Sequence, residues 1–244
     1  MIRFILVFSG FILYLILTLV IVPFGLLIGV FNRKARDYMF LRMVQGAFKS
    51  FLFITGTKLT VIGEENIPRD RAVLYIGNHR SYFDILVTYS RCPGLTGYVA
   101  KKSLQKVPLL NMWMKFLYCL FLDRDNMKEG MKMILTGVEY LKKGISVCIF
   151  PEGTRGEEEG KLLPFKGGSL KMAEKAGAPI IPMALSNTYS IWEKQFPKMR
   201  PAHVILEYGQ PIYTDQLDKD EKKNLGVRTQ KVIQEMLDKN TPNI

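Results

Sequence analysis

The chain has 244 residues, a formal net charge of +12 and a sequence pI near 9.5. This length accommodates one domain with a hydrophobic core and a small appendage. The positive charge predicts acidic partners, such as an anionic membrane surface or phosphorylated substrates. Nucleic acid is disfavoured, because the sequence has no zinc-ligand spacing, RNA-recognition pattern or basic aromatic strip. Cys92, Cys119 and Cys148 lack paired spacing, which predicts buried thiols in a reducing compartment.

Residues 4–31 contain no charged side chain and are rich in Leu, Ile, Val and Phe. As one helix the run is about 42 Å long, against a bilayer hydrocarbon core of about 30 Å. We therefore predict a break at Pro23 and Gly25, which divides the run into a long and a short segment. The run exceeds the apolar region of a signal peptide, and no Ala-x-Ala site follows, so we expect it to be retained. Whether it spans the bilayer or sits in one leaflet stays open.

Basic residues are distributed unevenly around this run. Arg33, Lys34 and Arg36 follow it, whereas Arg3 alone precedes it. This asymmetry predicts a protein of the cell membrane whose downstream chain lies on the cytoplasmic face.

Apolar residues between positions 40 and 52 recur at helical spacing, with Arg42 and Lys49 on the polar side. This helix is interpreted either as core-facing or as a basic amphipathic helix in the membrane interface. We assign residues 1–57 to an N-terminal membrane-associated element and residues 58–244 to an α/β domain.

The remaining chain alternates short apolar runs with helical stretches. The expected strands are 59–62, 72–76, 97–100, 119–122, 145–150, 180–185 and 204–208. The expected helices are 82–90, 109–116, 127–142, 168–176 and 218–239. This order predicts an α/β fold with a largely parallel central sheet flanked by helices.

One junction between a predicted strand and helix holds Asn78, His79, Ser81 and Asp84. In a continuous helix, His79 and Asp84 would lie roughly 140° apart and share no face. Ser81-x-x-Asp84 is, however, a capping-box pattern, which predicts Ser81 as the N-cap and Asp84 as the third helical residue. His79 then lies in the preceding loop, within reach of the carboxylate, as a general base with its orienting partner. The alternative is that Asp84 only caps the helix.

A second strand runs directly into Pro151-Glu152-Gly153-Thr154-Arg155-Gly156. Its glycine permits close backbone approach, and its arginine offers a planar fork suited to phosphate. The segment Phe121-Leu122-Asp123-Arg124 presents another arginine at a strand end. Ligands bind beyond the carboxyl ends of strands in open α/β sheets, although each segment alone is also typical of a surface turn.

Read together, these segments resemble a known family. Asn-His-x-Ser-x-x-Asp, Phe-Leu-Asp-Arg, Phe-Pro-Glu-Gly-Thr-Arg and the strand Ile180-Ile181-Pro182 are similar to the four ordered blocks of the PlsC-type glycerolipid acyltransferases, the 1-acylglycerol-3-phosphate acyltransferases. The resemblance covers roughly residues 58–209. Tyr118 and Asn111 stand where glycine is frequent, and Gly156 replaces a usual serine.

The resemblance implies transfer of an acyl chain from an acyl-CoA or acyl carrier protein thioester to the sn-2 hydroxyl of lysophosphatidic acid. His79 is implied as the base and Asp84 as its partner, without a covalent acyl-enzyme. The implied phosphate-binding residues are Arg124, Glu152, Gly153 and Arg155, and the supporting residues are Asn78, Ser81, Thr154 and Pro182. No metal and no further cofactor are implied. Backbone amides at the start of the Ser81 helix are candidate oxyanion donors.

Three alternatives remain at this stage. A related acyltransferase would use glycerol 3-phosphate, another lysophospholipid or an acylated lipid A precursor as acceptor. A catalytically silent homologue would bind lipid without turnover. A thioester hydrolase would release thiol without any acceptor.

Overall fold

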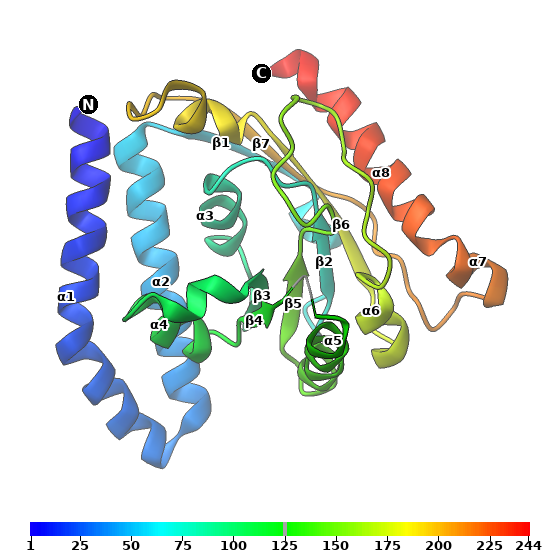
Figure 1. Ribbon diagram of the computed structural model, residues 1–244, viewed down its shortest axis with the longest axis horizontal. Coiled ribbons are helices and arrows are strands. Elements are labelled where there is room, and N and C mark those ends of the chain that lie inside the picture. The colour runs from blue at the N-terminus through cyan, green and yellow to red at the C-terminus, as the bar shows by residue number, and fades with distance from the viewer. Residues whose placement is uncertain (124–125) are drawn as a thin grey trace.

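The computed structural model describes residues 1–123 and 126–244. Seven strands form one sheet in the order β1-β7-β6-β2-β5-β3-β4 (Figure 1). Neighbouring strands are parallel except for β6 and β7, which are antiparallel. The strands are β1 (Lys58–Ile62), β2 (Leu74–Gly77), β3 (Thr96–Lys101), β4 (Leu120–Leu122), β5 (Ser146–Ile149), β6 (Ile180–Ser186) and β7 (His203–Tyr208). The predicted largely parallel α/β fold is confirmed.

Helices cover both faces of the sheet (Figure 1). They are α1 (Ile2–Phe31), α2 (Arg33–Thr55), α3 (Phe83–Tyr89), α4 (Leu110–Phe116), α5 (Met127–Lys142), α6 (Lys171–Ala176), α7 (Lys219–Lys223) and α8 (Leu225–Asn240). Short 3-10 helices include η3 (Thr188–Ile191) and η4 (Glu193–Gln195). The helix predicted over 218–239 is divided at Asn224, and Asp218 forms a capping box at the start of α7.

Two hydrophobic clusters lie on opposite faces of the sheet, because successive strand residues point to opposite sides. Tyr75 and Cys148 face a cluster built with α1 to α4. Their neighbours Leu74 and Val147 face a second cluster built with α5, α6 and α8. The loops that follow β2 and β5 are therefore carried by strands that are packed on both sides.

The predicted break in the first helix is wrong. α1 is continuous, with Pro23 inside it, and Figure 1 shows it bending rather than ending. Gly25 has a different role: a Cβ there would lie 2.4 Å from the Phe40 ring of α2, so glycine permits the two helices to approach. The chain reverses at Asn32, whose side chain accepts the Ala35 N–H at 2.9 Å and caps α2. Within the described residues, α1 alone is long and apolar enough to cross a membrane.

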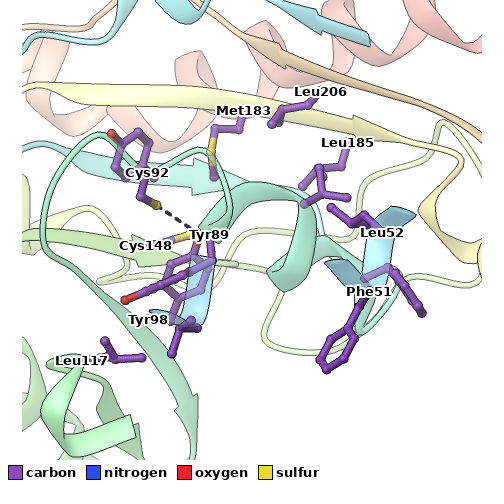
Figure 2. Packing of buried hydrophobic residues seen from close by; sticks show 14 of the residues in the cluster. Phe51, Leu52, Tyr89, Cys92, Tyr98, Leu117, Cys148, Met183, Leu185 and Leu206 are labelled. Carbon is purple, nitrogen blue, oxygen red and sulfur yellow. Dashed lines mark hydrogen bonds between the residues drawn. The ribbon is translucent and has the colours of Figure 1, made fainter. Parts of the chain in front are cut away.

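One face of the helix α2 packs against the core, and the location of its basic side in a membrane interface stays a prediction. Phe40 and Leu41 are fully buried and belong to the same cluster as strand residues of the sheet. Phe51 and Leu52 of α2 belong to the same cluster as Leu185 and Leu206, and Figure 2 shows Leu52 next to Leu185. The division of the chain after residue 57 stays a prediction.

All three cysteines are free, as predicted, and Cys92 and Cys148 are fully enclosed within this cluster. Burial raises the pKa of Cys92 to about 11, because the thiolate loses its hydration. Figure 2 shows the Cys92 thiol beside Tyr98, whose hydroxyl lies 3.8 Å from the sulfur. These thiols are therefore apolar packing groups rather than nucleophiles.

Candidate active site

The predicted site residues lie at the carboxyl-terminal ends of β2 and β5, which pair in parallel at the centre of the sheet. β2 leads into the loop 78–82, and β5 leads into the loop 150–156. The two loops are joined directly, because the Gly156 N–H donates to the His79 carbonyl oxygen at 2.7 Å. Residues from two sequence motifs thus meet at the sheet edge where open α/β folds bind ligands.

His79 and Asp84 are in contact. α3 begins four residues after His79, which leaves the histidine in the preceding loop. The His79 Nδ1 atom lies 2.7 Å from Asp84 Oδ2. Asp84 is fully buried, and its Oδ2 also accepts the backbone N–H groups of Arg80 and Ser81, while its Oδ1 accepts the Thr188 hydroxyl. Four donors therefore hold this carboxylate in one orientation.

The His79 ring is fixed on its second side by an aromatic contact. Its ring stacks on Phe150, with centroids 4.5 Å apart and an interplanar angle of 14°. With Nδ1–H donated to Asp84, the neutral imidazole carries its lone pair on Nε2. The side chain is 19% exposed, so the ring is partly open to a reactant.

Ser81 is occupied at its hydroxyl. The oxygen accepts the Phe83 N–H at 2.9 Å, and the O–H donates to Glu193 Oε2 at 2.7 Å. Ser81 therefore stabilises the helix start, although α3 begins one residue later than predicted, which makes Asp84 its second residue instead of its third. A serine nucleophile is not needed in this arrangement.

The backbone amides of residues 80–83 are all engaged, so the expectation that they serve as oxyanion donors is wrong. Arg80 and Ser81 donate to Asp84, Tyr82 donates to Glu193 at 2.8 Å, and Phe83 donates to the Ser81 hydroxyl. Side chains have taken the acceptor positions that an oxyanion would need.

Glu152 is buried between the two loops. Its Oε1 accepts the His79 N–H and its Oε2 accepts the Leu163 N–H, each at 2.8 Å. Burial raises the pKa of this carboxyl, while the two backbone donors oppose that rise. Because each of its oxygens accepts a backbone N–H, Glu152 fixes the position of the His79 loop. A carboxylate also has no positive charge with which to bind a phosphate.

Asn78 ties the same loop to the sheet. Its buried side-chain amide donates to the Leu185 carbonyl oxygen and accepts the Leu185 N–H, each at 2.8 Å. Pro182 is buried within β6, where its carbonyl oxygen accepts the Gly209 N–H at 2.8 Å. Both supporting residues therefore contact backbone rather than line an open surface.

The remaining candidates for phosphate binding differ in accessibility. Gly153 has a φ of 70°, and a Cβ there would lie 2.8 Å from the Cε atom of Lys166, so the loop requires glycine. Thr154 is exposed, and the Arg155 side chain is 40% exposed. Arg124 lies outside the described residues.

Besides Thr188 and Phe150, three further contributing residues were missed in the sequence. Arg80 is buried, donates to the Glu157 carbonyl oxygen at 2.6 Å and pairs with the Glu159 carboxylate, so it links the two loops. The position of Arg80 inside the motif of residues 78–84 is a sequence feature that could have identified it as part of the site. Lys166 covers Gly153, and Glu193 reaches the site from η4; neither belongs to a motif that marks it.

The departures from the family pattern have local explanations. Tyr118 has a φ of 59°, the left-handed region that favours the glycine frequent there. Its hydroxyl donates to Asp37, and its ring packs edge-on against Tyr140 at 5.4 Å. A Cβ on Gly156 would meet nothing closer than 3.6 Å, so a serine would fit as well. Asn111 lies in α4, where its side chain donates to the Gln105 carbonyl oxygen at 2.7 Å.

A largely parallel α/β sheet that presents a His–Asp pair at its carboxyl edge defines an acyltransferase domain here, since the family model described as Acyltransferase matches residues 58–186. The chain belongs to this family. It is 34% identical over 185 residues to the 1-acyl-sn-glycerol-3-phosphate acyltransferase of Saccharomyces cerevisiae, covering 75% of this chain and 60% of the relative.

A second relative, the 1-acyl-sn-glycerol-3-phosphate acyltransferase of Borreliella burgdorferi, is 32% identical over 75% of this chain and 73% of its own length. The crystal structure of the 1-acyl-sn-glycerophosphate (LPA) acyltransferase PlsC from Thermotoga maritima superposes with a TM-score of 0.79. The two chains are 26% identical, and the match covers 98% of this chain and 96% of the other. The likeness thus includes the N-terminal helices as well as the α/β domain.

Proposed function

We propose that the protein transfers an acyl chain from an acyl thioester to the free sn-2 hydroxyl of 1-acylglycerol 3-phosphate, giving phosphatidic acid. The observation that carries the proposal is the His79–Asp84 pair, held at 2.7 Å by a carboxylate that four donors fix in place. The names of the relatives support the choice of acceptor.

In this mechanism the Nε2 atom of His79 removes the proton from the acceptor hydroxyl. The hydroxyl oxygen attacks the thioester carbonyl carbon, the C–S bond breaks, and the thiolate takes the proton from the imidazolium. Asp84 stabilises the imidazolium and fixes the tautomer, as in other base–carboxylate pairs. The mechanism uses no acyl-enzyme, since the Ser81 hydroxyl is engaged, Cys92 and Cys148 are buried, and Cys119 is half-buried.

Arg155 binds the acceptor phosphate in this proposal, with Arg124 as its second contact. Arg155 lies in the loop 150–156, directly before Gly156, whose N–H donates to the His79 carbonyl oxygen. Its guanidinium is exposed. A phosphate held there brings the hydroxyl to the base, and such positioning lowers the barrier by several kcal/mol. Lysophosphatidic acid and the acyl-CoA or acyl carrier protein thioester are both anionic, which agrees with the net charge of +12.

We further propose that α1 embeds in one leaflet of the cell membrane, with the site on the cytoplasmic face. Residues along α1 are exposed and apolar, including Leu13, Leu17 and Val20. α2 lies alongside α1 (Figure 1) and carries Arg42 and Lys49, whose charges oppose deep burial in hydrocarbon. An anionic membrane surface would attract such cations.

Thiol release from one acyl-CoA, measured with a panel of acceptors, tests the function. We expect release only with an acceptor and fastest with 1-acylglycerol 3-phosphate, and a loss of at least about 10²-fold in kcat for His79→Ala. Faster turnover with glycerol 3-phosphate or another lysophospholipid would reassign the acceptor, and acceptor-independent release would indicate a hydrolase. Wild-type turnover by the folded His79→Ala variant would refute the mechanism.

A further inference from the structure

One carboxylate from outside the family-matched segment reaches both loops of the site. Glu193 lies in η4, beyond the matched residues 58–186, and its side chain is 14% exposed. Its Oε2 accepts the Ser81 hydroxyl at 2.7 Å, and its Oε1 accepts the Tyr82 N–H at 2.8 Å. The same Oε1 lies 3.6 Å from Nη1 of Arg155. Glu193 therefore bridges the loop of the base and the loop of the exposed arginine.

The Arg155 guanidinium has a second contact, with the face of an aromatic ring. Its Cζ lies 4.2 Å from the centroid of the Tyr82 ring. Tyr82 in turn packs against Trp192, with ring centroids 5.8 Å apart, and Trp192 directly precedes Glu193. The aromatic face and the carboxylate thus restrain the guanidinium from two directions, while 40% of the side chain remains exposed.

The Tyr82 ring and the Glu193 carboxylate both restrain the Arg155 side chain before a phosphate binds. A free arginine side chain must lose rotamer freedom when it binds, and restraint before binding removes part of that cost. The Tyr82 ring restrains the guanidinium on one side at 4.2 Å, and the Glu193 carboxylate attracts its Nη1 atom from 3.6 Å. The guanidinium N–H groups on the side away from Glu193 remain able to donate hydrogen bonds to a phosphate oxygen.

We propose that Glu193 is a positioning residue for phosphate recognition: its negative charge holds Arg155 over Tyr82, ready for the acceptor phosphate. The proposal rests on the proposed function, because it assumes that Arg155 binds the phosphate of a lysolipid. The hydrogen bonds from Glu193 to Ser81 and Tyr82 are structural, whereas its charge acts on Arg155. Replacing the charge while keeping the shape separates these two roles.

Glu193→Gln makes that separation. The glutamine carbonyl still accepts the Tyr82 N–H, and its amide donates to the Ser81 oxygen, so both contacts at the start of α3 persist, the second with its hydrogen-bond direction reversed. We expect the KM for 1-acylglycerol 3-phosphate to rise about threefold to tenfold, with kcat and its pH profile unchanged. The KM for 1-acylglycerol, which lacks the phosphate, should not change.

Two controls make the result specific. Glu235→Gln removes one carboxylate from the exposed face of α8, where Glu235 pairs with Lys231 at 3.9 Å, and should leave both KM values unchanged. In an Arg155→Ala background, Glu193→Gln should add nothing, because its effect passes through the guanidinium. An equal change for both acceptors, or a fall in kcat alone, would mean that Glu193 only supports the fold.

Binding without turnover gives a second readout. In the His79→Ala background, fluorescence of Trp192, beside Glu193, is titrated with 1-acylglycerol 3-phosphate, and Glu193→Gln should weaken the apparent affinity by the same threefold to tenfold. Unchanged or tighter binding would overturn the proposal, since tighter binding means that the carboxylate competes with the phosphate. If the wild-type protein shows no acceptor-dependent thiol release, the proposed function fails, and this titration still decides the role of Glu193.

Discussion

Asp84 and Arg155 carry the two charges central to the site, and the protein holds them in opposite ways. Asp84 is fully buried and accepts hydrogen bonds from four donors. Arg155 is 40% exposed and is restrained by one carboxylate at 3.6 Å and one aromatic ring. The end of the site around Asp84 is thus closed by protein groups, whereas the end around Arg155, which we propose to bind the phosphate, is partly open to solvent.

The largest effect on kcat is expected for Asp84, at the closed end of the site. Asp84→Asn places an amide against the N–H groups that now share Oδ2, and it removes the charge that stabilises the imidazolium. We expect kcat to fall by roughly 10³-fold to 10⁴-fold and the protein to lose about 1–3 kcal/mol of stability. Thiol-release kinetics and thermal unfolding in detergent measure the two losses.

Thr188→Val is the matched control, because it removes one donor from the other oxygen, Oδ1, and leaves His79 bonded. Its loss in kcat should be much smaller than that of Asp84→Asn. If Asp84→Asn retains wild-type kcat, the contrast between the two ends has no catalytic meaning.

An intermediate effect, on KM, is expected for Arg155 at the open end of the site. Arg155→Ala should raise the KM for 1-acylglycerol 3-phosphate by about 10-fold to 100-fold, with little change in kcat, because charge-assisted bonds to phosphate are lost. Arg155→Lys should recover part of the affinity but not the two-point geometry. Steady-state kinetics with a short-chain acceptor avoid effects of membrane partitioning, and a fall in kcat with an unchanged KM would assign Arg155 to the chemical step.

The smallest effect concerns Glu152, which lies between the two ends. Burial raises the pKa of its carboxyl, so the folded state binds the proton more tightly than the unfolded state does. The contribution of Glu152 to the free energy of unfolding is therefore lowest above its raised pKa, and it increases as the pH falls towards 4.5, the ordinary pKa of a glutamate. Thermal unfolding of wild type and Glu152→Gln at about pH 7 and about pH 5 should show wild type gaining relative stability at the lower pH. An opposite trend would mean that the pKa is lowered.

The sheet and the His79 loop were predictable because they depend on short-range patterns. Each strand is a short apolar run ended by polar or turn residues, and all seven were located within two residues at either end. The capping pattern placed His79 outside the helix, since five residues of helix cannot bring it to Asp84. Local chemistry alone carried that inference.

Contacts between distant segments were not predictable in the same way. Glu193 meets Ser81 across 112 positions, and no pattern around Glu193 signals the contact. Glu152 was assigned to phosphate from its motif, yet burial and two backbone donors give it a bracing role. Gly25 was taken as a helix breaker because sequence does not reveal that Phe40 lies against it.

The burial of α2 has a consequence for the membrane association that we propose. Phe40 and Leu41 belong to the same core as the strands, so α2 is packed together with the sheet that carries the His79 loop. With α1 embedded in one leaflet as we propose, its depth would set the height of His79 relative to the lipid headgroups. Bilayers of different headgroup thickness should then change the rate of acyl transfer without any change in the site itself.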